Sequence, residues 1–381
     1  MFKSNFFAAR LAKNYAKIFA SLPVGLLVSI IYAPRQVLRE EDQNEQCEIS
    51  TVKIDHSSYQ LAYVNQGRLF TNCVTNISII SQKHLVPYVS WQYLNGEVLP
   101  DAANFSLNRK LLMYSPPKKF NCEVVSLLTG GGGNYNYYHW LFDCLSRLFI
   151  VKVSRKIGEG TKYLIPDDAL PFQRDTLEAL GIDAASRISS KKCRHLIANQ
   201  LIVTSHPNPN PSLIPVWIIE FLRESFLRCN IAALADKKDF IYISREDSVN
   251  SRRLINESHL CKSLVSVGFG VYRLTELTFE QQVALFSQAK MIVGVHGAGL
   301  ANLAFASKGA VVYELFSAQY QPDMFQRIAL LTGLEYHRIV CEVRELMKPA
   351  QQLDFYIPEM DIVSIQRHAK KIVSYYAQQH A

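Results

Sequence analysis

Two side chains separated by one helical turn are the first candidates for chemistry. In "YNYYHWLFDCLSRLFIVK", residues 135–152, His139 and Asp143 are four positions apart. The apolar spacing predicts a helix, on which both side chains share one face and Arg147 extends the same line. A carboxylate beside an imidazole is a credible general base, which takes a proton from a reacting hydroxyl. The alternative is a buried polar relay that only anchors the helix.

A second candidate follows the apolar run "AKMIV" and reads "GVHGAGLAN", residues 294–302. Ligands of open α/β sheets bind beyond the carboxyl ends of the strands, where backbone N–H groups and a helix N-terminus attract anions. Gly297 and Gly299 would let a phosphate approach the backbone, and His296 would donate a hydrogen bond to it. A tight turn with a packed histidine is the alternative. The similar H-G-x-G loop of esterases requires a G-x-S-x-G nucleophile motif, which this sequence lacks.

Charged side chains beside two other predicted strands fit an anionic ligand as well. Glu314 ends the run "VVYE", where a carboxylate can accept hydrogen bonds from ribose hydroxyls or form an edge salt bridge. Arg245 directly follows "IYIS", and Arg252 comes seven residues later. Guanidinium groups bind phosphate through two N–H groups at once. For Arg252 and its neighbour Arg253 the alternative is a solvated helix face.

These candidates need strands whose ends meet at a common edge. From about residue 120 onward, strand-like and helix-like segments alternate, which predicts parallel sheets covered by helices on both faces. Thr278 with Gln281 predicts the start of one helix, and Gly333 the end of another. The Pro/Asn cluster "HPNPNPSLIP", from residue 206, predicts a domain boundary. The resulting division is an N-terminal segment with its linker (1–46), an α/β domain (47–206) and a second α/β domain with a final helix (207–381).

The composition limits the classes of ligand and partner that are expected. The 381 residues carry a formal net charge of +8, which favours anionic ligands such as nucleotide phosphates. The basic residues are dispersed, so nucleic acid is not expected. The 8 cysteines show no C-x-x-C or zinc spacing, which suits a reducing compartment. No convincing D-x-D metal signature occurs.

The apolar segment at residues 18–33, "IFASLPVGLLVSIIYA", follows several basic residues. It is shorter than the roughly 20 apolar residues of a bilayer span and contains Pro23. Three interpretations stay open: a core or docking segment, an amphipathic helix on a membrane surface, and an anchor or signal.

Together, the chemistry-bearing stretches resemble glycosyltransferase family 61, also called the DUF563 group. "NYYHWLFDCLSRL" is similar to the family's N-x-x-H-W-x-x-D-x-L-P-R-L motif, with Ser146 in place of the proline. "YISR…RRLINE" is similar to Y-I-S-R…R-x-x-x-N-E, and "VGVHGAGLANLAFASKGAVVYELF" to G-x-H-G-A-G-L-x-N-x-x-F-x-x-x-G-x-x-x-x-E. The resemblance covers residues 120–316, and the family includes plant xylan transferases and animal O-linked N-acetylglucosaminyltransferases.

The resemblance implies a GT-B fold, in which two Rossmann-like domains face a cleft that holds a nucleotide sugar, with a UDP-sugar expected. It also implies inverting transfer to a glycan hydroxyl without a metal and without a cofactor other than the donor. The N-terminal domain would face the acceptor, with Asp143, or His139 backed by Asp143, as the base. The C-terminal domain would bind the donor, with Glu314 at the ribose and the remaining contacts from Arg245, Arg252, His296, Gly297, Ala298, Gly299 and Asn302.

The biological setting is inferred by analogy. Eukaryotic members of the family usually carry an anchor and disulfides and work in the lumen of the Golgi or endoplasmic reticulum. The scattered cysteines and poor anchor of this chain favour a bacterial member that makes capsule or other surface polysaccharide. We then expect a cytoplasmic enzyme at the inner membrane face, with residues 1–33 in peripheral contact and a glycan or lipid-linked glycan as acceptor.

Two other classes stay open. A non-catalytic sugar-nucleotide-binding or assembly protein would keep the glycine-rich turn, but the presence of both His139 and Asp143 counts against it. A sugar-nucleotide epimerase on the same scaffold would release an isomerised sugar without an acceptor.

Overall fold

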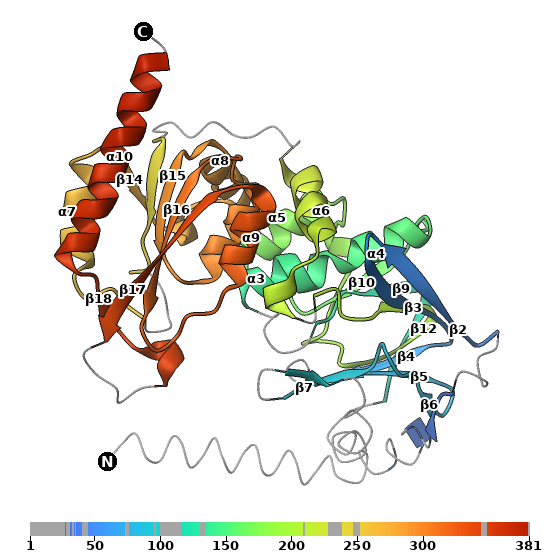
Figure 1. The fold of residues 1–381 in the computed structure, drawn as a ribbon. Coiled ribbons are helices and arrows are strands. Elements are labelled where there is room, and N and C mark those ends of the chain that lie inside the picture. The colour runs from blue at the N-terminus through green and yellow to red at the C-terminus, as the bar shows by residue number, and fades with distance from the viewer. Residues whose placement is uncertain are drawn as a thin grey trace, which may run out of the picture. The chain divides into compact units, whose positions relative to one another are not determined.

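The structure of the chain is a computed structural model. The residues that it describes are 27, 31–32, 34, 36–39, 45–72, 76–94, 97–99, 116–129, 135–208, 210–227, 238–246, 252–343 and 349–379. The chain divides into two compact units, drawn in Figure 1. Unit 1 comprises Met1–Leu170 and Ile182–Pro209, and unit 2 comprises Pro171–Gly181 and Asn210–Ala381.

Unit 1 is built on a mixed sheet rather than on the parallel sheet expected for its half of the chain. Its first strands are β1 (Gln36–Val37), β2 (Cys47–Ile54), β3 (Ser57–Asn65), β4 (Arg68–Thr71), β5 (Asn76–Ser81), β6 (His84–Leu85), β7 (Trp91–Leu94) and β8 (Glu97–Leu99). Most pairs among them are antiparallel, because turns of a few residues join β2 to β3, β4 to β5, β5 to β6 and β7 to β8, and such turns connect antiparallel neighbours. The exception is β1, which pairs parallel with β6. Asp55 at φ 52° makes one of these turns, in the left-handed region that Asp tolerates.

The strand β12 (His195–Thr204) joins the two halves of this sheet. On one side it pairs antiparallel with β3 and β4. On the other it pairs parallel with β9 (Lys118–Ser126), which is followed by β10 (Lys162–Ile165) and β11 (Arg187–Ser189). The predicted parallel α/β arrangement is therefore present in the half of unit 1 that carries the His139 segment.

Unit 2 contains the predicted parallel sheet. Its strand order is β14-β13-β15-β16-β17-β18, and the first five strands are parallel. They are β13 (Phe240–Ile243), β14 (Phe269–Tyr272), β15 (Met291–Val295), β16 (Val311–Ser317) and β17 (Glu335–Val343), with β18 (Phe355–Tyr356) antiparallel at the edge. After β14 the chain returns past β13 to form β15. The strand order therefore reverses between β13 and β15, where open α/β sheets bind ligands.

Helices cover both faces of the unit 2 sheet. Figure 1 shows α7 (Glu257–Val265) and α10 (Glu359–Gln379) on one face, where their apolar side chains share a core with β13, β15, β16 and β17. The other helices of this unit include α6 (Val216–Phe226), α8 (Phe279–Gln288) and α9 (Met324–Thr332). The capping box of Thr278 with Gln281 is confirmed, and so is the helix end at Gly333, which has a φ of 70°.

One helix departs from the predicted division. The segment α5 (Pro171–Ala179) was expected inside the domain 47–206, but it belongs to unit 2. The reason is its contact with α8, where the Asp175 carboxylate accepts a hydrogen bond from the Phe279 N–H at the first turn. The chain finally leaves unit 1 after Pro209, close to the predicted boundary, because His206 and Asn208 are bonded inside unit 1.

The N-terminal predictions fall largely outside the described residues. Of residues 18–33 only Leu27, Ile31 and Tyr32 are described, so the three interpretations of that segment stay predictions. Within the described parts of the chain, no helix is both long enough and apolar enough to cross a membrane. The six described cysteines are free thiols.

Candidate functional site

The predicted helix around His139 forms, but it contains a wider turn. Its parts are α3 (Tyr137–His139), a π-helical segment at Trp140–Leu145 and α4 (Arg147–Ser154). Asn136 begins it, because its side-chain oxygen accepts hydrogen bonds from the backbone N–H groups of Tyr138 and His139. The π-helical segment was not predicted, and such insertions are frequent at functional sites. The large apolar side chains of this helix are buried: Trp140, Phe142, Leu145 and Leu148.

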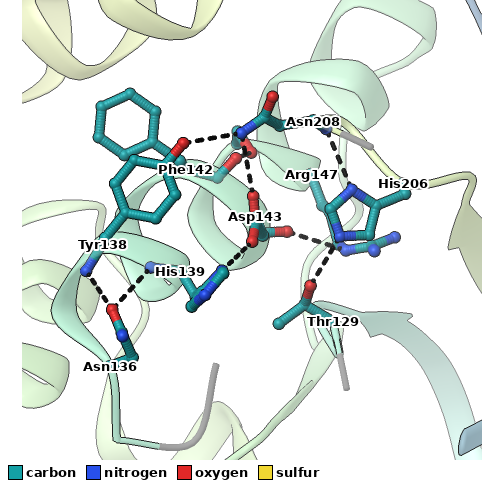
Figure 2. Close-up of polar contacts among 10 residues, drawn as sticks. Thr129, Asn136, Tyr138, His139, Phe142, Asp143, Arg147, His206 and Asn208 are labelled. Carbon is teal, nitrogen blue, oxygen red and sulfur yellow. Dashed lines mark hydrogen bonds and ion pairs between the residues drawn. The ribbon is translucent and has the colours of Figure 1, made fainter. Parts of the chain in front are cut away.

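His139 and Asp143 lie together as the spacing predicted. His139 Nδ1 is 2.6 Å from Asp143 Oδ2. Figure 2 marks this contact with a dashed line. The Asp143 side chain is 5% exposed, whereas that of His139 is 28% exposed. The other carboxylate oxygen, Oδ1, accepts from Asn208 Nδ2 at 3.5 Å. Asp143 is thus enclosed by protein partners, and His139 is the member of the pair that solvent reaches.

The protonation of His139 follows from these contacts. Burial lowers the pKa of its imidazole, but the hydrogen bond and negative charge of Asp143 outweigh burial and raise the pKa above 6.5. In the neutral ring the proton resides on Nδ1, because Nδ1 faces a carboxylate oxygen. Nε2 then carries the lone pair and faces away from Asp143, which is the arrangement of an oriented general base.

A set of polar residues linked by hydrogen bonds lies beside Asp143, and the sequence did not predict it. Asn208 Nδ2 also donates to the Tyr138 hydroxyl at 3.1 Å, and its backbone N–H donates to His206 Nδ1 at 3.2 Å. His206 Nε2 lies 3.1 Å from Thr129 Oγ1. Burial lowers the pKa of His206 to about 4, so the ring is neutral and donates from Nε2 (Figure 2). The stretch "HPNPNP" predicted a boundary only, and nothing in it pointed to residues 65 positions upstream.

Arg147 lies on the same helix face as His139 and Asp143, as predicted, but its side chain donates hydrogen bonds to backbone carbonyl oxygens. Its Nε donates to the Asp143 carbonyl at 3.0 Å, and its Nη1 donates to the carbonyl oxygens of Thr204 and Ser205 at 2.8 and 3.1 Å. The side chain is fully buried, and burial lowers its pKa to about 10. Arg147 therefore fastens the π-helical segment to the end of β12.

We expect Arg147→Met to lower the free energy of unfolding by about 3 kcal/mol, because it removes the buried guanidinium group that donates to the carbonyl oxygens of Asp143 and Thr204. Urea denaturation of the two proteins measures the difference. The matched control is Arg155→Met, since Arg155 is partly exposed and pairs with Glu123 near the surface. That change is expected to cost about 1 kcal/mol or less. Equal losses in the two variants would contradict the anchoring role of Arg147.

In unit 2, Arg245 and the glycine-rich turn meet where the strand order reverses. Arg245 follows β13 and His296 follows β15, two adjacent parallel strands. Arg245 Nη1 donates to the His296 carbonyl at 2.9 Å, and the Arg245 N–H donates to Glu257 Oε1 at 3.3 Å. The predicted juxtaposition of these two positions is therefore present, at the edge where open α/β sheets generally bind ligands.

The two glycines of this turn leave space for other side chains of the protein. A Cβ atom on Gly297 would lie 1.5 Å from Arg245 Nη1, and one on Gly299 would lie 2.6 Å from Leu274 Cδ1. The prediction had explained both glycines by the approach of a phosphate. The structure shows that Gly297 first of all lets the guanidinium group lie against the backbone. The helix that follows, Ala298–Phe305, is a 3₁₀-helix.

His296 and Glu314 are buried together. His296 Nδ1 hydrogen-bonds to Glu314 Oε1, and the Tyr336 hydroxyl donates to Glu314 Oε2 at 2.6 Å. The imidazole stacks on Phe316 at a centroid distance of 5.1 Å. Burial is the largest influence on His296 and, with the nearby charges of Arg245 and Arg252, outweighs Glu314 and lowers its pKa below 6.5. The predicted ribose contact of Glu314 stays a prediction, which this geometry does not favour, because both its oxygens hold protein partners.

The remaining predicted donor-site residues have contacts of different kinds. Arg252 lies before α7, not on a solvated face: its φ is 93°, its guanidinium lies 5.2 Å from the Tyr320 ring, and its N–H donates to Asp354. A positive φ is uncommon outside glycine and clusters at functional sites. Asn302 is buried and donates to Gln282 and the Gly299 carbonyl. Ala298 is half-buried in the turn.

The segment that contains the candidate residues of both units is similar to known proteins. Residues 137–313, from the start of the His139 helix to β16, match the family model described as Glycosyltransferase 61. A β-1,2-xylosyltransferase of Arabidopsis thaliana is 29% identical over 114 residues, which is 26% of this chain and 21% of that protein. An EGF domain-specific O-linked N-acetylglucosamine transferase of Drosophila melanogaster is 30% identical over 114 residues, 29% of this chain and 21% of that protein.

A longer match extends over most of the chain. A protein O-linked-mannose β-1,4-N-acetylglucosaminyltransferase 2 of Tetraodon nigroviridis is 27% identical over 309 residues, 74% of this chain and 51% of that protein. The matched part thus spans about half, or less, of the length of these relatives. All three come from plants or animals, so they do not support the predicted bacterial capsule role. The matches make residues 137–313 similar to glycosyltransferase family 61, and the relatives that match this chain are named as glycosyltransferases.

Proposed function

We propose that the protein transfers a sugar from a nucleotide sugar to a hydroxyl group of a glycan acceptor, with inversion at the anomeric carbon. The observation that carries this proposal is the oriented His139–Asp143 pair inside the segment that matches the family model. In the proposal, unit 1 supplies the base and unit 2 binds the donor. The GT-B arrangement and a UDP-sugar as donor are part of the same proposal.

The proposed reaction is one in-line displacement. His139 Nε2 takes the proton of the acceptor hydroxyl, while Asp143 stabilises the imidazolium that forms. The acceptor oxygen forms a bond to the anomeric carbon, and the bond from that carbon to the diphosphate oxygen breaks. Arg245 and Arg252 are the cationic side chains that we assign to the negative charge on the leaving diphosphate. His296, held neutral by burial, is assigned to position the turn that carries the Arg245 contact.

A pH profile tests the assignment of the base. A base must be deprotonated, and the pKa of His139 is raised above 6.5, so kcat/KM should fall as the pH drops through an apparent pKa above 6.5. Asp143→Asn removes the charge that raises this pKa, leaving burial to lower it. In this variant, the fall of the residual kcat/KM at acidic pH should therefore move to lower pH. An unchanged limb in Asp143→Asn would assign the titration to another group.

The proposed function is tested by binding and turnover together. UDP, GDP, CMP, UDP-xylose and UDP-N-acetylglucosamine are titrated by calorimetry, each with EDTA and with Mg²⁺. The proposal of a metal-independent donor site is supported if one nucleotide binds equally well with EDTA and with Mg²⁺, and if this binding is lost in Arg245→Ala. Binding without release of nucleoside diphosphate in the presence of acceptors would favour the non-catalytic binding protein. An isomerised sugar released without any acceptor would favour the epimerase.

The acceptor is the narrower part of the proposal. The names of the relatives specify EGF domains and O-linked mannose on proteins, so glycoproteins of these kinds form the first panel. A lipid-linked oligosaccharide forms the second, because the predicted surface-polysaccharide role requires it. Transfer to only one of the panels decides between a protein-bound and a lipid-linked acceptor.

A further inference from the structure

Three side chains that the proposed reaction does not use converge at the start of β17. Glu335 and His337 are two residues apart on this strand, so they share one face of the sheet. His368 reaches the same place from the middle of α10. His337 Nε2 is 2.7 Å from Glu335 Oε1, and His368 Nε2 is 3.9 Å from the same oxygen. Two imidazole nitrogens and one carboxylate oxygen therefore lie within 4.8 Å of one another.

This set matches what a divalent transition metal requires. Zinc binds His nitrogen and Glu oxygen at about 2.0–2.2 Å in a tetrahedron, which places ligand atoms roughly 3.3 Å apart. The distances of 2.7 and 3.9 Å bracket that separation, so small rotations of the side chains suffice. The three side chains are 25% to 55% exposed, which leaves an entry path for the ion and space for a water as fourth ligand.

A tyrosine behind the cluster orients one of the histidines. The Tyr313 hydroxyl lies 2.8 Å from His368 Nδ1. When Nδ1 donates to this oxygen, the lone pair of His368 is on Nε2, the atom that faces Glu335. Tyr313 also stacks on His337, at 4.5 Å between centroids, because β16 and β17 place the two residues side by side. Metal-binding histidines are typically held by such a partner at the other ring nitrogen.

We propose that Glu335, His337 and His368 bind Zn²⁺ or a similar divalent transition metal, which fastens α10 to the sheet. The site is separate from the donor-binding residues: Tyr313 and Glu314 are consecutive on β16, so their side chains point to opposite faces. The apolar contacts of α10 include Ile362, Ile365 and Ala369, whereas Val373 is 51% exposed. The metal would thus secure the helix near the point where its packing ends.

The test measures zinc binding to the full-length, tag-free protein by calorimetry, with Co²⁺ absorption as a second readout. We expect one tight site per chain. His337→Gln and His368→Gln should each weaken it by more than about 100-fold, and Tyr313→Phe by about 10-fold. The matched control is His259→Ala, because His259 forms an exposed pair with Glu359 that no third such ligand joins among the described residues. That variant should bind zinc as the wild type does.

The thermal unfolding midpoint is the second measurement, because an ion that binds only the folded state stabilises it. Zinc should raise the midpoint of the wild type and of His259→Ala, but not that of His368→Gln. Circular dichroism confirms that each variant is folded, and Glu335→Gln provides a nearly isosteric alternative if a histidine variant is not. Absence of binding in the wild type, or unchanged binding in His337→Gln and His368→Gln, would overturn the proposal. Neither result depends on whether the protein transfers a sugar.

Discussion

His139→Ala is expected to lower kcat by roughly 10²–10⁴-fold, the range that a positioned general base contributes. The physical reason is that Nε2 of this ring is the basic atom that Asp143 orients, and the substitution removes it while leaving the buried carboxylate in place. KM for the donor should change little, since donor binding is assigned to unit 2. Steady-state kinetics with saturating acceptor measures both quantities.

His84→Ala is the control for this prediction, because His84 is a partly exposed histidine of unit 1 whose ring hydrogen-bonds to the Gln36 side chain. It should keep the wild-type kcat. The variant Asp143→Asn separates the two members of the pair: it keeps the size of the side chain but loses the charge that stabilises the imidazolium. If His139→Ala kept full activity and Asp143→Asn lost it, the carboxylate itself would be the base.

Arg245→Ala is expected to lower kcat/KM by roughly 10²–10³-fold, as the loss of one charge-stabilising donor does in other enzymes. The Arg245 guanidinium lies at the switch point of the unit 2 sheet and is held there by the His296 carbonyl. Calorimetry with the nucleoside diphosphate should show weaker binding in parallel. The control is Arg273→Ala, because Arg273 is an exposed arginine of the same unit that pairs with Glu246 and Glu276.

Gly297→Ala provides an independent route to the same effect. The new Cβ atom would occupy the position of Arg245 Nη1, 1.5 Å away, so the guanidinium has to move. Since both substitutions act through one group, the double variant should be little worse than Arg245→Ala alone. Additive losses in the double variant would show that Gly297 serves the ligand rather than the arginine.

Much of the α/β part of the chain could be predicted from local pattern. The apolar runs that became β13, β15 and β16 are short, continuous and bounded by turn residues, which is typical of buried parallel strands. The pairing of His139 with Asp143 was also local, because four-residue spacing on a helix determines it. The π-helical turn between them was not predictable, since nothing in the residue types distinguishes it from an α-helical turn.

The contacts that were missed depend on residues far apart in the chain. Glu314 was predicted to contact a ligand because it lies in a buried strand, but its partner Tyr336 is revealed only by the register of β16 against β17. Asn208 approaches Asp143 across 65 residues. The antiparallel strands before residue 86 carried no motif, and their pairing follows from turns that the sequence does not mark strongly.

The position of α5 has a consequence for how the chain is made. Unit 1 is interrupted by Pro171–Gly181, so the polypeptide passes between the units three times, after residues 170, 181 and 209. Domains generally fold as units, from the N-terminus, during synthesis. The ribosome therefore releases α5 well before α8, whose first turn Asp175 contacts, has been translated. A fragment that begins at residue 210 would lack this helix. Dividing the chain at one position therefore cannot yield the two complete units as separate fragments.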